Sequence, residues 1–382
     1  MIHIVADHNI PFLRGALDNR AKVTYLPAPG IIRNQLKDAD ALIIRTRTRC
    51  NKELLEGTPV NYIATATIGH DHIDTAYCNE KGIQWNNAPG CNAGSVMQYM
   101  ASALAHITIS ESKKIKDICV GIIGVGHVGK KVEHLCRTLN MQVLLNDPPR
   151  AREEGSSGFT GLDELLARAD IVSMHMPLIT EGPDKSLRMA DDAFFRKMKP
   201  GAWFVNTARG EVMHTTALKE VLRAGKLSGA VIDVWENEPG IDHELLQLAT
   251  IATPHIAGYS LDGKANGTAV SVQAVSRFFK LGLDNWYPHH IPKPAQPVIT
   301  PKSDNQSTEV LVYDALMHTY NILEDSRKLK ASPNDFENFR NHYPPRREFT
   351  AYSINDRTLG FAATVVLKEL GFREIPSVQA DI

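Results

Sequence analysis

The sequence lacks an apolar run that approaches the ~20 residues needed to span a bilayer, and it lacks an excess of charge of either sign. Over 382 residues, 42 Lys and Arg nearly balance 43 Asp and Glu, which leaves a formal net charge of -1. A chain so nearly neutral has no general attraction for nucleic acid or for an anionic membrane, so neither is expected as a partner. Any binding of phosphate must therefore be local.

Cysteine is scarce, and its spacing suggests no function. The five cysteines are an odd number without a C-x-x-C pair: Cys50, Cys78, Cys91, Cys119 and Cys136. We interpret them as reduced packing residues, so neither a disulfide frame nor a zinc site is expected. The run His70-Asp71-His72 has too few ligands at the wrong spacing for zinc, and no metal is predicted. The amino terminus has no basic segment before a long apolar one, so no secretory signal is expected and the location predicted is cytoplasmic.

The length is too great for one ordinary core and predicts two or three domains. In the first part, short β-like runs at residues 2–5, 23–26, 41–44 and 62–65 alternate with polar or amphipathic stretches. This alternation predicts a small α/β unit with a mostly parallel sheet. Asn92 then opens a stretch rich in helix formers, which predicts a long helix that leads out of this unit.

A second series of strand-like runs follows, with helical patterns between most of them. The runs are at residues 120–123, 142–145, 171–174, 202–205, 230–233 and 250–253, and two of the helical patterns are at 162–168 and 216–222. Six strands separated by helices are typical of a doubly wound dinucleotide-binding domain. The fold class predicted is therefore α/β, with two Rossmann-like domains that have doubly wound parallel sheets.

The composition changes after about residue 285. Residues 286–301 contain five prolines and are predicted to be a linker. Beyond them, helical patterns near residues 308–330 and 357–371 and a strand-like run at 349–354 predict a small α+β domain, which we expect to make a subunit contact. The domains predicted are a substrate-binding lid (1–92 and 256–285), an NAD-binding domain (93–255) and a C-terminal dimerisation domain (286–382).

A glycine loop lies between the first strand of the second series and a helical pattern. It comprises Gly124, Val125, Gly126, His127, Val128 and Gly129, and Asp147 closes the next strand. Bare backbone close to a pyrophosphate, a helix N-terminus aimed at it and a carboxylate for the ribose hydroxyls are what a dinucleotide requires. Asp147 favours NAD over NADP because it repels a 2′-phosphate. The alternative is a tight strand-to-helix turn that binds no ligand.

Three polar residues each stand at the end of a later strand-like run. Arg209 can hold a substrate carboxylate by two parallel hydrogen bonds, and His255 can move a proton. Glu238, beside that imidazole, would favour its charged form, although Glu236 competes for the role. Taken singly, each residue could equally be a solvated loop charge or a structural polar group. Together they predict hydride transfer at a carbon that bears a hydroxyl group.

In these residues the chain resembles the D-isomer-specific 2-hydroxyacid dehydrogenase family. The resemblance covers roughly residues 1–285 and rests on the loop GIIGVGHVG, the segment NTARG, the run DVWENEP and the closing TPHIAGY. It implies that Arg209 binds the substrate carboxylate, that Glu238 orients the histidine and that His255 is the acid/base. It also implies that the cofactor is NAD and that Asp147, Met176, Asp233 and Gly258 contact it.

A narrower resemblance, to family members with an additional C-terminal domain, rests on uncommon segments that include residues 64–72, 88–92, 146–150 and 343–348. It implies a small phosphorylated 2-hydroxy acid as substrate, with Thr46, Thr67 and Tyr259 facing it. Our hypothesis for the phosphate is Arg45, with Arg346 or Arg347 supplied by the third domain of a homodimer. The alternatives are another 2-hydroxyacid dehydrogenase, such as a 3-phosphoglycerate enzyme, or a non-catalytic NAD-sensing adaptor on the same fold.

Overall fold

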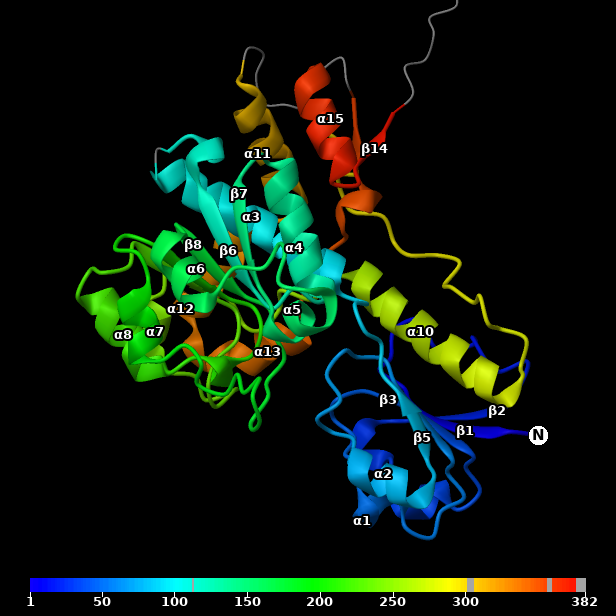
Figure 1. Ribbon diagram of the computed structural model, residues 1–382. Coiled ribbons are helices and arrows are strands. Elements are labelled where there is room, and N and C mark those ends of the chain that lie inside the picture. Colours follow the sequence, from blue (N-terminus) through cyan, green and yellow to red (C-terminus); the bar gives the residue numbers. More distant parts are fainter. Residues whose placement is uncertain (112, 301–305, 356–358, 376–382) are drawn as a thin grey trace, which may run out of the picture. The chain divides into compact units, whose positions relative to one another are not determined.

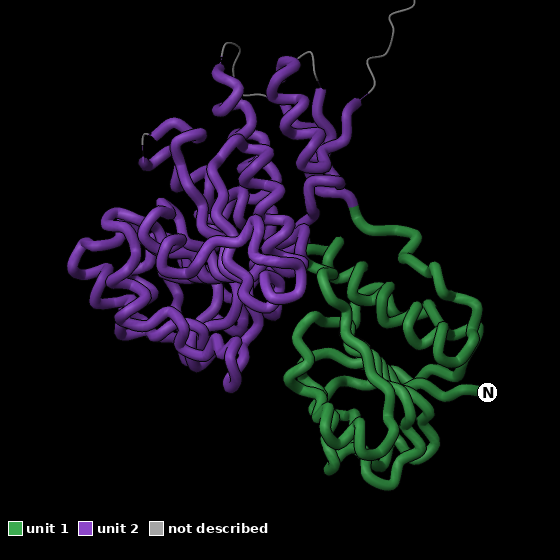
Figure 2. The backbone as a smooth tube through the Cα atoms, in the orientation of Figure 1, with its two compact units in different colours: residues 1–92, 260–292 green, residues 93–259, 293–382 purple. Residues whose placement is uncertain are grey.

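The computed structural model describes residues 1–111, 113–300, 306–355 and 359–375. Contacts within the chain define two compact units, coloured separately in Figure 2. Unit 1 comprises residues 1–92 and 260–292, and unit 2 comprises residues 93–259 and 293–382. The C-terminal residues thus share a unit with the residues expected to bind NAD. The finer division into three domains stays a prediction.

Unit 1 is built on a five-stranded parallel sheet in the order β2-β1-β3-β4-β5 (Figure 1). Its strands are β1 (His3–Asp7), β2 (Lys22–Leu26), β3 (Ala41–Ile44), β4 (Tyr62–Thr65) and β5 (Gln84–Asn86), and its helices are α1 (Lys52–Leu55), α2 (Thr75–Lys81) and α10 (Leu261–Phe279), with 3-10 turns at Ala28–Gly30 and Arg33–Leu36. The four strands expected in this region are confirmed. Strand β5 was not predicted, because it lies at the sheet edge and has a single apolar residue, Trp85.

Helix α10 returns the chain to unit 1 after the second sheet is complete. Ser260 caps it by accepting a hydrogen bond from the Gly263 N–H at 2.8 Å. Its Gly267 faces the end of β4, where a Cβ would come within 2.6 Å of the Ala66 carbonyl oxygen. Glycine at this position therefore lets the helix pack closely on the strand, and Val272 and Val275 complete one core of unit 1.

Unit 2 contains a six-stranded parallel sheet in the order β11-β10-β9-β8-β6-β7. Its strands are β6 (Cys119–Ile123), β7 (Gln142–Asn146), β8 (Ile171–Met174), β9 (Trp203–Asn206), β10 (Gly229–Ile232) and β11 (Ile251–Ala252). Its helices are α3 (Ala93–Glu111), α4 (His127–Thr138), α5 (Pro148–Glu154), α6 (Leu162–Arg168), α7 (Asp192–Lys197), α8 (Thr215–Arg223) and α9 (His243–Leu248), with 3-10 turns at Ile115–Asp117 and Gly210–Val212. The direction of winding reverses between β6 and β8, and ligands of such folds bind beyond the carboxyl ends of the strands at that point.

The C-terminal residues of unit 2 form a small α+β structure. It comprises strands β12 (Val298–Ile299), β13 (Ser353–Ile354) and β14 (Arg373–Glu374), helices α11 (Thr308–Thr319), α12 (Ile322–Ala331), α13 (Phe336–Asn341) and α15 (Phe361–Glu369), and 3-10 turns at Pro333–Asp335 and Phe349–Ala351. Helix α11 packs against α3 and helix α12 against β11. The C-terminal residues therefore cover the six-stranded sheet at its edge and on the side of α3.

Two predictions for this region were wrong in detail. The single helix expected near residues 308–330 is two helices, because Tyr320 is extended and the Asn321 side chain caps a new helix. The strand expected at 349–354 begins as a 3-10 turn, and only its last two residues pair with other strands. The helix expected at 357–371 corresponds to α15, although residues 357 and 358 lie outside the described part of the chain.

The five cysteines are all buried, and burial raises the pKa of Cys136 to about 12. None of the helices in the described part of the chain is long and apolar enough to cross a membrane.

Candidate active site

The glycine loop joins β6 to α4 at the point where the winding reverses. Gly124 has a φ of +83°, and a Cβ there would come within 2.6 Å of the Met176 nitrogen. A Cβ on Gly129 would lie 2.1 Å from the Gly124 carbonyl oxygen, so both glycines are required by backbone packing. Gly126 differs, because a Cβ there would meet nothing within 4 Å. Bare backbone at Gly126 thus faces open space at the first turn of a helix that no side chain caps, which suits a pyrophosphate.

Asp147 follows β7 and connects the two loops at this edge of the sheet. Its Oδ2 accepts a hydrogen bond from the Val125 N–H at 2.7 Å, and its Oδ1 caps α5 by accepting one from the Arg150 N–H at 3.1 Å. A carboxylate offers about four acceptor positions, so capacity for ribose hydroxyls remains. Arg150 bonds the Val125 carbonyl and forms an ion pair with Glu154. Its guanidinium is therefore already engaged.

A histidine that the sequence analysis did not single out lies beyond β8. His175 Nε2 contacts the Ser173 hydroxyl at 2.8 Å and Nδ1 contacts the Thr207 hydroxyl at 3.0 Å, which ties β8 to the segment after β9. Burial lowers the pKa of His175 to about 3, so the ring is neutral. Met176 follows, with its backbone against Gly124. The expected cofactor contact through the Met176 backbone fits this position.

Arg209 follows β9 in a turn that Asn206 organises. The Asn206 side chain accepts a hydrogen bond from the Ala208 N–H and donates one to the Arg209 carbonyl. Arg209 Nη1 donates to the Ala208 carbonyl at 2.8 Å, and no carboxylate among the described residues forms an ion pair with this guanidinium. Gly210 lets the turn rest on the loop after β10, since a Cβ there would lie 2.0 Å from the Trp235 carbonyl carbon. A partly buried arginine without an acidic partner is suited to an anionic ligand.

Glu238 and His255 form a hydrogen-bonded pair. His255 Nδ1 donates to Glu238 Oε2 at 2.7 Å, while Glu238 Oε1 accepts from the Trp235 N–H at 3.0 Å. Burial acts to raise the pKa of Glu238, but the hydrogen bond and charge of His255 outweigh it and hold that pKa below its usual value. The competing acid, Glu236, accepts instead from the Thr215 N–H at the start of α8. The carboxylate that reaches the imidazole is thus that of Glu238.

Asp233 holds the turn that carries the imidazole. Its carboxylate, which is 1% exposed, accepts hydrogen bonds from the Thr253 hydroxyl at 2.6 Å and from the Ile256 and Ala257 N–H groups at 2.8 and 2.9 Å. His255 lies inside this turn with a φ of +55°, a conformation that non-glycine residues rarely adopt without support. Burial raises the pKa of Asp233 against the opposing effect of His255. The Asp233 carboxylate thus positions the turn that carries His255.

The C-terminal residues reach the same turn. Arg346 Nη2 donates to the Ile256 and Ala257 carbonyls at 3.2 and 2.6 Å, and its guanidinium lies 4.3 Å from the centroid of the Tyr320 ring. Only 6% of Arg346 is exposed. Arg346 is thus enclosed in protein and holds two backbone carbonyls through Nη2, and its contact with the substrate phosphate stays a prediction.

Two neighbours of Arg346 also make contacts within unit 2. The Arg347 carbonyl accepts a hydrogen bond from the Gln98 side chain at 2.8 Å. Glu348 accepts from the Ser95 hydroxyl at 2.8 Å, beside Gly94, where a Cβ would clash with that carboxylate. An acid at the first turn of α3 is stabilised by the helix dipole. This segment thus docks the C-terminal residues onto α3 and onto the His255 turn.

In unit 1 the expected substrate residues gather at the carboxyl edge of the sheet. Arg45 follows β3, and its Nε lies 3.2 Å from Oδ2 of the fully buried Asp7 at the end of β1. Thr46 is exposed. The Thr67 hydroxyl forms hydrogen bonds with the Thr65 hydroxyl at the end of β4 and with the Gly69 carbonyl. Parallel strands end at one edge, which explains why these residues lie in one region of unit 1.

Within unit 2 the catalytic candidates and Tyr259 come from neighbouring loops. The loops after β9 and β10 are in contact at Gly210 and Trp235, and the loops after β10 and β11 are joined by Asp233, Glu238 and His255. Gly258 and Tyr259 follow directly, with the Tyr259 N–H bonded to the Ile256 carbonyl at 2.9 Å. The three residues taken from the sequence as a set therefore belong to three adjacent loops at one edge of the sheet.

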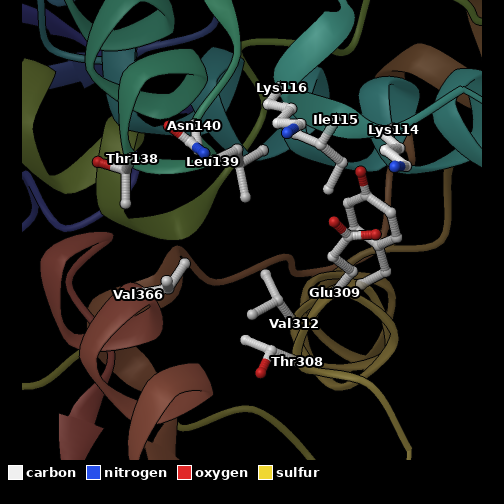
Figure 3. A pocket seen from close by; sticks show the side chains of 11 residues that line it. Lys114, Ile115, Lys116, Thr138, Leu139, Asn140, Thr308, Glu309, Val312 and Val366 are labelled. Carbon is white, nitrogen blue, oxygen red and sulfur yellow. The ribbon is translucent and has the colours of Figure 1, made fainter.

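Figure 3 shows a separate cavity of about 250 Å³. It is lined by the turn at Ile115–Asp117, the end of α4 and helices α11 and α15, and none of the residues expected in the active site lines it. In the part of the chain that the structure describes, no three His, Cys, Asp or Glu side chains are grouped as metal ligands.

The fold and site agree with comparisons against known protein families. The profile of the D-isomer specific 2-hydroxyacid dehydrogenase NAD binding domain matches residues 98–257, and a profile described as a domain of unknown function matches residues 291–371. The class defined by the fold and by the loops described above is therefore that of the D-isomer specific 2-hydroxyacid dehydrogenases, which are NAD-dependent enzymes.

Individual relatives narrow the class. The chain is 47% identical to erythronate-4-phosphate dehydrogenase of Bacteroides thetaiotaomicron over 92% of its length and 98% of that protein. It is 38% identical to the Escherichia coli protein of the same name over 97% and 98% of the two chains. The chain belongs to the erythronate-4-phosphate dehydrogenase family, which confirms the narrower resemblance noted in its sequence.

A solved structure supports the same fold. D-lactate dehydrogenase from Aquifex aeolicus, complexed with NAD and lactic acid, is 27% identical and covers 76% of this chain and 100% of its own, with a TM-score of 0.60.

Proposed function

We propose that this protein oxidises 4-phospho-D-erythronate to 2-oxo-3-hydroxy-4-phosphobutanoate with NAD, in the biosynthesis of pyridoxal 5′-phosphate. The observation that carries the proposal is the hydrogen bond of 2.7 Å between Glu238 and His255. The adjacent loop carries Arg209, which has no acidic partner among the described residues. The identity of 38–48% to relatives named erythronate-4-phosphate dehydrogenase supports the choice of substrate.

The residues of the glycine loop fit a dinucleotide. Gly126 leaves room at the start of α4, and Asp147 retains acceptor capacity for the ribose. We assign Gly124, His127, Val128 and Gly129 of this loop to cofactor binding, together with Met176, Asp233 and Gly258 from neighbouring loops. When bound, NAD supplies the hydride acceptor at C4 of its nicotinamide ring.

The roles of the three polar residues follow from their hydrogen bonds. Because Nδ1 of His255 is bonded to the Glu238 carboxylate, Nδ1 carries the proton and Nε2 is the free base. In the proposed reaction Arg209 fixes the C1 carboxylate by two parallel hydrogen bonds. His255 Nε2 takes the proton of the C2 hydroxyl while the hydride leaves C2, so the C–H and O–H bonds break as the carbonyl forms. Glu238 stabilises the imidazolium that results.

We assign recognition of the substrate outside its reacting carbon to unit 1 and Tyr259. Arg45 and Thr46 follow β3, Thr67 follows β4, and Arg347 remains a candidate for the phosphate. Since one face of Arg45 is occupied by Asp7, its other N–H groups are those available to an anion. Replacing Arg45 with Ala should raise the KM for the phosphorylated acid at least tenfold and change that for an unphosphorylated 2-hydroxy acid little. The exposed Arg20→Ala serves as the control in the same unit.

We further propose a cytoplasmic homodimer in which the C-terminal residues make the contact. Phe361 and Val365, one helical turn apart on α15, are 84% and 46% exposed, and Val310 on α11 is 42% exposed. Sedimentation of Phe361→Ser with Val365→Ser should give a monomer where the unchanged protein gives a dimer.

One assay tests the proposed reaction. Purified protein with NAD should reduce the cofactor on addition of 4-phospho-D-erythronate, with a kcat/KM at least tenfold above that for D-3-phosphoglycerate or D-lactate. His255→Ala should lose turnover and still bind NAD. A preference for D-3-phosphoglycerate would favour another dehydrogenase of the family. NAD binding without turnover of any acid would favour a non-catalytic adaptor.

A further inference from the structure

The C-terminal part of the chain, for which the sequence indicated no chemistry beyond a hypothetical phosphate contact, contributes an arginine to the Glu238–His255 pair. Arg340 lies on α13, and its Nη1 is 3.7 Å from Glu238 Oε2, the same oxygen that accepts the hydrogen bond from His255 Nδ1. Its Nε donates to the Tyr259 hydroxyl at 3.1 Å. One guanidinium thus spans the carboxylate beside the imidazole and the tyrosine that follows the histidine by four residues.

The position of Arg340 is set by buried packing. Phe336, on the preceding turn of α13, is 1% exposed and belongs to the same core cluster as Trp235, whose N–H binds Glu238. Phe339 packs against that cluster. Both aromatic residues anchor α13 to the core cluster that contains Trp235. The position of Arg340 near Glu238 therefore follows from the packing of its helix.

We propose that Arg340 is a positioning residue for the reaction: it fixes the Glu238 carboxylate and sets the pH range in which His255 acts as a base. The inference rests on the proposed function of the Glu238–His255 pair. It assigns to the C-terminal region a part in the chemistry of its own subunit, in addition to any contact between subunits.

The electrostatic effect has a definite sign. Arg340 Nη1 and His255 Nδ1 lie within 6.4 Å of each other, the sum of their two distances to the shared oxygen. A cation this close disfavours the imidazolium, in opposition to Glu238 and Asp233, which favour it. The buried Arg346 is a second cation near the turn, and it bonds the Ile256 and Ala257 carbonyls. Removing the charge of Arg340 leaves the two acids less opposed, so His255 becomes neutral only at higher pH.

The test compares three variants of the full-length protein. Arg340→Gln removes the charge, Arg340→Lys retains it, and Arg327→Gln removes an exposed charge on α12 as a matched control. For each, kcat and KM are measured from pH 5.5 to 9.5 with the best 2-hydroxy acid found for the unchanged protein. Two unit charges about 6 Å apart shift one another's titration by about half a pH unit in bulk water and by about two at the effective dielectric constant of a protein surface. The acid limb of the kcat profile should therefore move up by an amount in that range in Arg340→Gln. The KM should rise less than tenfold, because Tyr259 loses only one hydrogen bond.

The outcomes separate the alternatives. A profile restored toward that of the unchanged protein in Arg340→Lys, with no shift in Arg327→Gln, supports the proposal. An acid limb that stays in place in a folded Arg340→Gln overturns it, as does a KM that rises more than tenfold for the phosphorylated acid alone, which would make Arg340 a phosphate ligand. Arg340→Met serves as the neutral variant if Arg340→Gln does not fold. Failure of the unchanged protein to turn over any 2-hydroxy acid would instead refute the proposed function.

Discussion

The buried carboxylate of Asp233 allows the strongest test of how the site is held together. It accepts three hydrogen bonds from the segment that carries His255, at 2.6, 2.8 and 2.9 Å, and it is 1% exposed. Asp233→Ala would leave the Ile256 and Ala257 N–H groups buried without an acceptor. Each such group costs about 1–3 kcal/mol, and removal of a buried charge offsets part of the total. We therefore expect a net loss of about 3 kcal/mol in the free energy of unfolding.

Asp233→Asn provides the matched comparison. The amide keeps one acceptor oxygen, and it avoids the cost that raises the pKa of the buried carboxyl. Because the folded-state pKa of Asp233 is raised, its contribution to stability is fully present below the unfolded value of 3.8 and is lost as the pH rises through the folded value. At pH 7 a neutral amide does not suffer that loss. The Asn variant should therefore lose less stability than Asp233→Ala, because its single acceptor oxygen can serve only one side of the site and one N–H group is left without an acceptor.

Asp233→Ala should lower activity as well as stability. Without the Asp233 carboxylate, the turn that carries His255 at its φ of +55° loses three hydrogen bonds, and a shift of about 1 Å in a catalytic group can cost roughly a hundredfold in rate. Asp233→Ala should thus lower kcat about a hundredfold and the melting temperature by about 6–12 °C. Calorimetry and NADH absorbance measure the two effects. An Ala variant that melts within 2 °C of the unchanged protein (a shift below about 1 kcal/mol) would refute the idea that this carboxylate holds the turn.

Three further predictions concern other parts of unit 2. Gly126→Ala should fold normally and bind NAD at least tenfold more weakly in calorimetric titration. Gly129→Ala should lose stability, because its Cβ would lie 2.1 Å from the Gly124 oxygen. Equal stability of the two variants would contradict the packing argument. His175 should weaken the fold in acid, because its stability contribution is present above the unfolded pKa of 6.5 and is lost as the pH falls toward about 3. Between pH 7 and pH 4, the free energy of unfolding in urea should therefore fall by about 2–3 kcal/mol more in the unchanged protein than in His175→Asn. An equal fall in the two proteins would contradict this. Glu238→Gln should lower kcat about a hundredfold with little effect on the NAD dissociation constant, and an unchanged kcat would exclude its role.

Much of the fold could be predicted because strands buried on both faces have continuous apolar sequences. The runs at residues 171–174 and 62–65 match β8 and β4 as observed. The candidate site residues could be proposed for a related reason: parallel strands end at one edge, so polar residues that directly follow such runs lie in neighbouring loops. Edge strand β5 and the break between α11 and α12 escaped prediction, because neither has a local signal stronger than its surroundings.

The contacts that the sequence did not indicate involve arginines of the C-terminal region. Nothing in the run Pro344-Pro345-Arg346 says whether the guanidinium faces solvent or backbone carbonyls, since that depends on how distant segments pack. Arg340 lies in a short polar helix without a motif, and its contact with Glu238 joins residues about a hundred positions apart. Only the packing of Phe336 into the core near Trp235 brings that contact about. Local sequence can identify candidate reacting groups, but it cannot identify the partners that adjust them.

The arrangement around His255 explains why its partners come from several parts of the chain. Contacts from outside the loop stabilise a histidine with a positive φ, because that conformation is disfavoured for residues with a Cβ. Asp233 binds the N–H groups on one side of the turn, and Arg346 binds the carbonyls of the same residues, Ile256 and Ala257. The turn is thus held by an acid from the NAD-binding sheet and by a base from the C-terminal region. Removal of the C-terminal region should therefore impair catalysis even where NAD still binds, a loss that dimer formation alone would not explain.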